Sequence, residues 1–237
     1  MKNLKVWLVF LPLFTIACTD DSSTEITETA PELKGVKKKV GISPRNTANP
    51  YDLAGSAHND ILDIIDDTSI NSYSIEDIAA VIDSISALNP DLALFPNDTT
   101  VSSKLSEITW IVNDNDAITE VLTTSTLGNS AKSSLSSFVN SLLLAADDPY
   151  EDIYAMIVAY ETNVINSTGF TSEEKQILLT TTSVVRYSVY RKKREDKDWD
   201  TSVGNIAATV SGAEEGLVLG LKMAVTVGLC QNHNITQ

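Results

Sequence analysis

The chain has 237 residues, of which 43% are hydrophobic, and a formal net charge of −15. This length provides for one sizeable hydrophobic core or two small ones. The acidic charge argues against nucleic acid and anionic lipid surfaces as general partners. The sequence contains no phosphate-binding loop, no paired CxxC motif and no zinc-type histidine spacing, so we expect no cofactor and no bound metal.

The amino-terminal segment predicts export. Lys2 and Lys5 precede an uncharged apolar run at residues 6–17, which is shorter than the roughly 20 residues of a membrane-spanning helix. A basic start, a short apolar core and a small final residue are typical of a secretory signal peptide. We place that signal peptide at residues 1–17.

A cysteine follows the apolar run directly. The letters TIAC at residues 15–18 resemble the lipobox of bacterial lipoproteins, although Thr15 stands where leucine is usual. The resemblance implies that Cys18 is lipidated and anchors the protein in a membrane by its acyl chains. An ordinary signal peptide followed by a chance cysteine is the alternative.

The residues behind Cys18 indicate which membrane and which face. The letters TDD at residues 19–21 resemble the acidic export signal of Bacteroidota surface lipoproteins. This resemblance implies a lipid anchor in the outer membrane and exposure at the cell surface, with a periplasmic orientation as the alternative. The composition of residues 18–48, rich in Ser, Thr, Glu and Lys, predicts a disordered tether behind the lipidated cysteine.

The rest of the chain predicts a single all-α domain at residues 49–229, with seven or eight helices, and a polar tail at residues 230–237. Apolar residues recur at helical spacing, and no alternating run is long enough to predict a strand. Cys230 is left without a cysteine partner, so we read it as a small apolar packing residue or a thiol of the tail. The helices are expected, in chain order, around residues 50–65, 74–88, 101–112, 118–122, 135–143, 149–165, 171–189 and 203–229.

Local signals mark several helix starts. Asn49 is expected to cap the first helix, with proline at its first position. Ser74 precedes two acidic residues and is expected to cap the second. Thr171 and Glu174 match the capping box, which places a helix start directly behind Thr171.

The predicted last helix carries a row of small residues. The row repeats every four residues, a spacing that lets helix backbones approach closely. Packing within the domain or in a homo-oligomer is the favoured reading, because Glu214 and Glu215 would lie near the centre of a membrane span, where acidic groups are costly. A membrane-active or oligomer-forming protein is the alternative. The row consists of Gly204, Ala208, Gly212, Gly216, Gly220, Ala224 and Gly228.

An acidic face follows one of the two histidines in the chain. Asp60, Asp63 and Asp67 share one face of the first predicted helix, close to His58. Oxygen ligands of this kind could hold calcium, but one helix face encloses no ion, so a solvated acidic face is favoured. A hydrolase-type enzyme that uses His58 and these carboxylates is an alternative function.

The densest charged stretch is basic. Arg191, Lys192, Lys193 and Arg194 precede Trp199. A basic patch on an acidic protein could dock an acidic partner or a second copy of the chain. A solvated helix end, where cations complement the helix dipole, is the favoured reading.

Several short motifs also resemble uncharacterised secreted proteins of Bacteroidota. They are NPYD at residues 49–52, EEK at 173–175, RY at 186–187 and WD at 199–200, ahead of the glycine-rich end. This resemblance implies no activity. The sequence as a whole predicts a lipid-anchored helical module with a binding or structural role and no catalysis.

Overall fold

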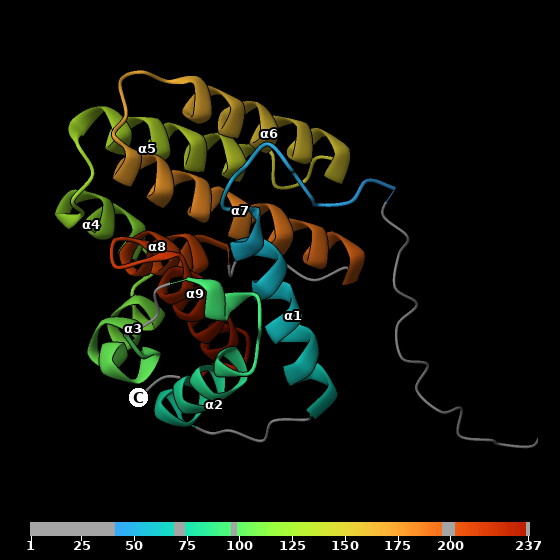
Figure 1. The fold of residues 1–237 in the computed structure, drawn as a ribbon, viewed down its shortest axis with the longest axis vertical. Coiled ribbons are helices and arrows are strands. Elements are labelled where there is room, and N and C mark those ends of the chain that lie inside the picture. The colour runs from blue at the N-terminus through green and yellow to red at the C-terminus, as the bar shows by residue number, and fades with distance from the viewer. Residues whose placement is uncertain (1–40, 69–73, 96–98, 196–201, 236–237) are drawn as a thin grey trace, which may run out of the picture. The chain divides into compact units, whose positions relative to one another are not determined.

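The computed structural model describes residues 41–68, 74–95, 99–195 and 202–235 (Figure 1). Residues 1–40, with the predicted signal peptide, Cys18 and most of the predicted tether, lie outside these ranges. The described residues form nine α-helices and two short 3-10 helices and contain no strand. The all-α prediction is therefore confirmed.

The helical segments expected from the sequence are all present, and the count rises to nine because the last one is divided. The α-helices are α1 (Asp52–Thr68), α2 (Ile75–Ala87), α3 (Leu105–Asn113), α4 (Ala117–Thr124), α5 (Asn129–Leu144), α6 (Tyr150–Asn166), α7 (Ser172–Glu195), α8 (Ser202–Ala213) and α9 (Leu217–Asn232), with 3-10 helices at Leu92–Leu94 and Val101–Lys104.

Two of the predicted caps are observed. The hydroxyl of Ser74 accepts a hydrogen bond from the backbone N–H of Asp77 at 3.1 Å. At the start of α7, the Thr171 N–H donates to the Glu174 carboxylate at 2.7 Å, and the Glu174 N–H donates to the Thr171 hydroxyl at 3.1 Å. This reciprocal pair is the capping box that the spacing predicted.

The core is organised around α9 and α7. Every residue of α9 from Leu217 to Cys230 is buried, and α9 packs against α8, α1, α2, α3 and α7. Helix α7 packs in addition against α6 and α8, and Figure 1 shows α5, α6 and α7 running together along one side of the bundle. A helix that is buried all round needs neighbours on every side, so α9 explains why the short helices gather here.

The predicted single helix at residues 203–229 is wrong, because the chain turns back on itself within it. Helix α8 ends at Ala213 and α9 begins at Leu217. Between them Gly216 has a φ of 150° and a ψ of 160°, a conformation that glycine adopts readily and other residues do not. The four-residue repeat runs through this turn and so conceals it.

Two predicted domain boundaries are also wrong. The tether was expected to extend to residue 48, but Pro44 and Asn46 are buried against the bundle. The polar tail was expected to begin at residue 230, but α9 continues to Asn232 and Cys230 is fully buried. Of the two readings of Cys230, the structure therefore shows the packing residue.

Candidate functional site

Two fully buried charges meet between α6 and α7. The side chains of Glu161 and Arg186 are both 0% exposed, and an Arg186 Nη2 hydrogen bonds to Glu161 Oε1 at 3.2 Å. Asp52, the first residue of α1, lies 2.7 Å from the same nitrogen. Burial opposes the charge of Arg186, but the carboxylates of Glu161 and Asp52 outweigh it and raise the pKa of the guanidinium.

An amino-terminal segment completes this buried pair. We call residues 41–51 the strap. The Asn46 side-chain amide donates to Glu161 Oε2 at 2.6 Å, and the Asn49 amide donates to Glu161 Oε1 at 2.8 Å and to the Leu179 carbonyl at 3.0 Å. The strap therefore supplies the hydrogen bonds that a buried carboxylate needs beyond its ion pair.

The strap also satisfies the guanidinium. Arg186 Nη1 donates to the carbonyl of Pro44. Beside this contact, the Tyr154 hydroxyl of α6 donates to the Arg45 carbonyl at 3.0 Å. Asn49 was expected to cap the first helix, and its Oδ1 does accept the N–H of Tyr51 at 2.8 Å. Its amide nitrogen, however, donates to Glu161 and Leu179, which are distant in the sequence.

Sequence reasoning missed this network. NPYD and RY were noted as motifs without a role, and Glu161 was not noted. A signal for it exists: Glu161 occupies an inward position of α6, in helical register with buried Ile157 and Val164. A charged residue inside an apolar stripe needs a partner, and its presence predicts a buried polar contact.

His58 is a buried residue of α1 and does not line an open site. Its side chain is 1% exposed, its Nδ1 is 3.1 Å from Asn59 Oδ1, and its Nε2 has no hydrogen-bond partner. Burial, with a smaller contribution from the nearby cations Arg191 and Lys192, lowers the pKa of His58 to about 4. The imidazole is enclosed, its lowered pKa favours the neutral form, and its hydrogen bond goes to an amide and not to a carboxylate.

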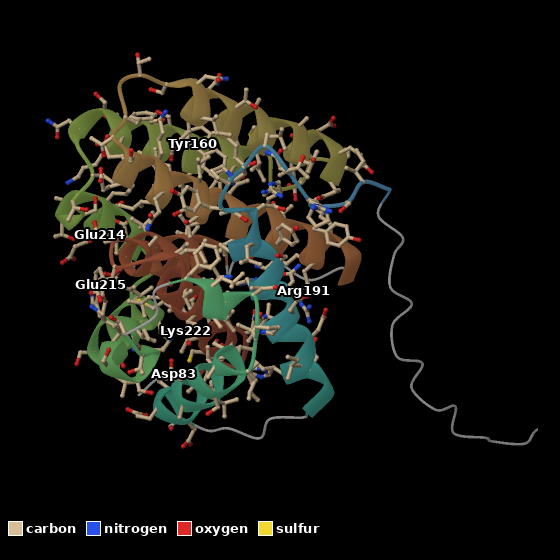
Figure 2. All side chains as sticks on the ribbon, viewed as in Figure 1. Asp83, Tyr160, Arg191, Glu214, Glu215 and Lys222 are labelled. Carbon is tan, nitrogen blue, oxygen red and sulfur yellow. The ribbon has the colours of Figure 1, made fainter. Side chains whose placement is uncertain are left out.

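The acidic face and the basic stretch bind each other. Asp63 and Asp66 each contact one terminal nitrogen of Arg191 at 2.5 Å. Figure 2 shows Arg191 beside helix α1. Arg191 is 6% exposed and Lys192 is 9% exposed. The basic stretch is therefore neither a free docking patch nor a solvated helix end at these two positions, because α1 covers Arg191.

The remaining members of these two sets are placed as follows. Asp60 is an exposed residue. The partial burial of its carboxyl, together with the charge of Asp63, raises the pKa of that group. Lys193 donates to the Ala146 carbonyl at 2.8 Å. The side chains of Asp67 and Arg194, and all of Trp199, lie outside the described residues. No group of three or more potential metal ligands is found in the described part of the chain.

A second buried ion pair joins α9 to α2. Lys222 is 2% exposed, and its ammonium lies 3.0 Å from Asp83 Oδ1 and donates to the Thr99 carbonyl at 3.1 Å. Asp83 also accepts the N–H groups of Val101 and Ser102 at 2.9 and 3.1 Å. Figure 2 shows Lys222 and Asp83 in the lower part of the bundle.

The electrostatics of Asp83 favour its ionised form. Burial alone would raise the pKa of this carboxyl, but the hydrogen bonds from Val101 and Ser102 and the Lys222 ammonium lower it. The sequence pattern alone indicates no partner for Lys222. In the structure, Lys222 connects α9 to α2 and to the segment that leads into the second 3-10 helix.

The row of small residues makes its close contacts within the molecule. A Cβ on Gly212 would lie 2.7 Å from the Cα of Gly220. A Cβ on Gly228 would lie 2.7 Å from Asn205, and one on Gly204 would meet Gln231 at 2.3 Å. Gly212 and Gly220 thus pack backbone to backbone across the α8–α9 hairpin, whereas Gly204 and Gly228 leave room for the side chains of Gln231 and Asn205.

The exposed turn of this hairpin is tied down by its two acids. Glu215 forms an ion pair with Lys104, and Glu214 accepts a hydrogen bond from the Thr126 hydroxyl at 3.0 Å. No helix among the described residues combines the length and the apolar character that crossing a membrane requires. Gly216 belongs to the turn, so the prediction that it packs in mid-helix is wrong.

These observations define the structural class of the protein. The described residues form an all-α bundle in which the buried charges Arg186, Arg191 and Lys222 each hold two or more segments together. Comparison with family models, curated proteins and solved structures finds no match to this chain.

The buried imidazole makes stability depend on pH. In the folded state the pKa of His58 is lowered from 6.5 to about 4, so His58 stabilises the fold fully above pH 6.5. We expect a loss on the order of 3 kcal/mol as the pH falls from 6.5 to 4. Urea unfolding at a series of pH values checks this, with His58→Gln as the variant in which this part of the acid dependence should disappear. A His58→Gln protein that retains the full dependence would show that other groups cause it.

Proposed function

We propose that this protein is a lipid-anchored helical module with a binding or structural role and no catalysis. The single observation that carries the proposal is the junction of Ala17 and Cys18 behind a short apolar run with a basic start. Such a junction is what the export and lipidation of a bacterial lipoprotein require. The protein would be exported, anchored to the outer membrane through Cys18 and displayed at the cell surface.

The folded body supports a structural or binding role in one respect. Its buried charges are used in ties between helices: Arg186 joins α7 to α6 and the strap, and Lys222 joins α9 to α2. His58, the basis of the hydrolase alternative, is enclosed at 1% exposure. A general base must come within hydrogen-bond reach of its substrate, and an enclosed imidazole does not.

The small-residue row supports the same proposal over the membrane-active alternative. Gly212 and Gly220 face each other within one chain, so the row already has its packing partner. A partner protein, or a second copy of the chain, would therefore meet the outer faces of the helices and not this row. Apart from its lipid, the module has no proposed contact with the membrane.

The anchor is tested by replacing Cys18 with alanine. In cells that export the protein, Cys18→Ala should abolish incorporation of labelled fatty acid and move the chain from the membrane fraction to soluble or unprocessed pools, because two or three acyl chains give stable attachment and none gives no attachment. Cys230→Ala is the matched control, since Cys230 is buried, and it should leave both readouts unchanged. Membrane fractionation of Cys18→Ala that equals wild type would overturn the proposal.

A further inference from the structure

The strap is held mainly by polar contacts. Its buried residues are Pro44, Asn46 and Asn49, Tyr51 is its one large side chain that packs, partly buried, against the core, and Ile42 is 40% exposed. By contrast, α1 buries Ala54, Ile61 and other apolar residues in the core. Each net hydrogen bond contributes about as much stability as one buried methylene group, which is far less than a buried helix face.

The polar contacts of the strap converge on one place. The Pro44 carbonyl and the Asn46 and Asn49 amides all contact Arg186 or Glu161. These two residues lie at least 112 positions from Asn49 in the sequence, so the strap can leave without unwinding either helix that carries the charges. Its departure would remove contacts from the charged pair but, apart from Tyr51, little apolar surface from the core.

We propose that the strap opens and closes as a separate unit on the folded bundle and thereby covers and uncovers the Glu161–Arg186 pair. The open form presents a carboxylate beside a guanidinium, a pair that suits the N–H and C=O groups of a peptide or a carboxamide. Asn46, Asn49 and the Pro44 carbonyl supply these groups from within the chain. The strap is thus a cover formed by the chain's own peptide.

The position of the strap links its opening to a pull on the predicted tether. In the sequence the strap lies between Cys18, the predicted site of lipidation, and the start of α1 at Asp52. If Cys18 anchors the chain, a pull on the tether reaches the strap before it reaches α1. This link rests on the proposed function, whereas the opening itself is a property of the bundle and can be measured without any membrane.

Hydrogen exchange of the full chain, read by mass spectrometry at a series of low urea concentrations, tests the opening. We expect the strap amides, which include those of Asn46 and Ala48, to exchange faster than those of α9 and with little dependence on urea. A small urea dependence follows because little surface is exposed in the opening. Strap amides that exchange at the rate of α9, with the same urea dependence, would overturn the proposal.

A matched pair of tyrosine variants localises the effect. Tyr154→Phe removes the hydroxyl that donates to the Arg45 carbonyl and should speed strap exchange about fivefold, the effect of one hydrogen bond. Tyr160→Phe removes a hydroxyl of the same helix that bonds Ser134 at 3.1 Å and should leave strap exchange unchanged. Equal acceleration by both variants, or by neither, would count against a separately held strap. Fatty-acid labelling of Cys18 is a different readout, so the failure of either proposal is distinguishable from the failure of the other.

Discussion

Replacing Gly212 by alanine is expected to destabilise the bundle by about 2–3 kcal/mol. The added Cβ would lie 2.7 Å from the Cα and 2.8 Å from the N of Gly220, both backbone atoms of α9. Backbone cannot rotate away as a side chain does, so α8 and α9 must separate. Since Gly→Ala in an unconstrained helix stabilises by up to about 1 kcal/mol, close packing and local propensity predict opposite signs.

Urea unfolding midpoints of Gly212→Ala and Gly169→Ala provide the matched comparison. Gly169 lies in an exposed loop, where a Cβ would meet only the Ser167 hydroxyl at 3.7 Å. This control should change stability by less than about 0.5 kcal/mol. A Gly212→Ala protein as stable as wild type would show that the two helices are not in backbone contact at this point.

Replacing Glu161 by glutamine is expected to cost about 3–5 kcal/mol. The substitution keeps the side-chain volume but leaves the fully buried Arg186 with a weaker partner. Asn46 and Asn49 donate to different oxygens of Glu161, and the amide nitrogen that replaces one of these oxygens cannot accept, so one of the two hydrogen bonds is lost. Among the described residues, Asp52 is then the only carboxylate left beside the buried Arg186, and a buried charge that loses a partner is among the largest costs that a single substitution can cause. The measurement is the free energy of unfolding in urea.

Glu215→Gln is the matched control for this substitution. Glu215 also forms an ion pair, with Lys104, but its side chain is 44% exposed, and an exposed pair contributes about 0–1 kcal/mol. A Glu161→Gln protein that loses no more stability than Glu215→Gln would show that the buried pair is hydrated or dispensable.

The helices could be predicted because their signals are local. The apolar spacing of α2, the Ser74 cap and the box formed by Thr171 and Glu174 depend on residues within one or two turns of each other. The turn at Gly216 was hidden because a four-residue repeat of small residues continues through it. The pair Glu214 and Glu215 was the available signal, read instead as evidence against a membrane span.

The buried polar network could not be predicted because its contacts are distant in sequence. Asn46 meets Glu161 across 115 positions, and Lys222 meets Asp83 across 139. Local pattern identifies which residues face inward but not which of them meet. The same gap explains why Arg191 was expected at the surface, when Asp63 of α1 in fact covers it.

The proposed lipid anchor is tested most directly by the mass of the amino-terminal peptide of the protein purified from membranes. The account predicts a peptide that begins at Cys18 and carries two or three acyl chains, with residues 1–17 absent. A peptide that begins at Met1, or that contains Cys18 without lipid, would contradict it.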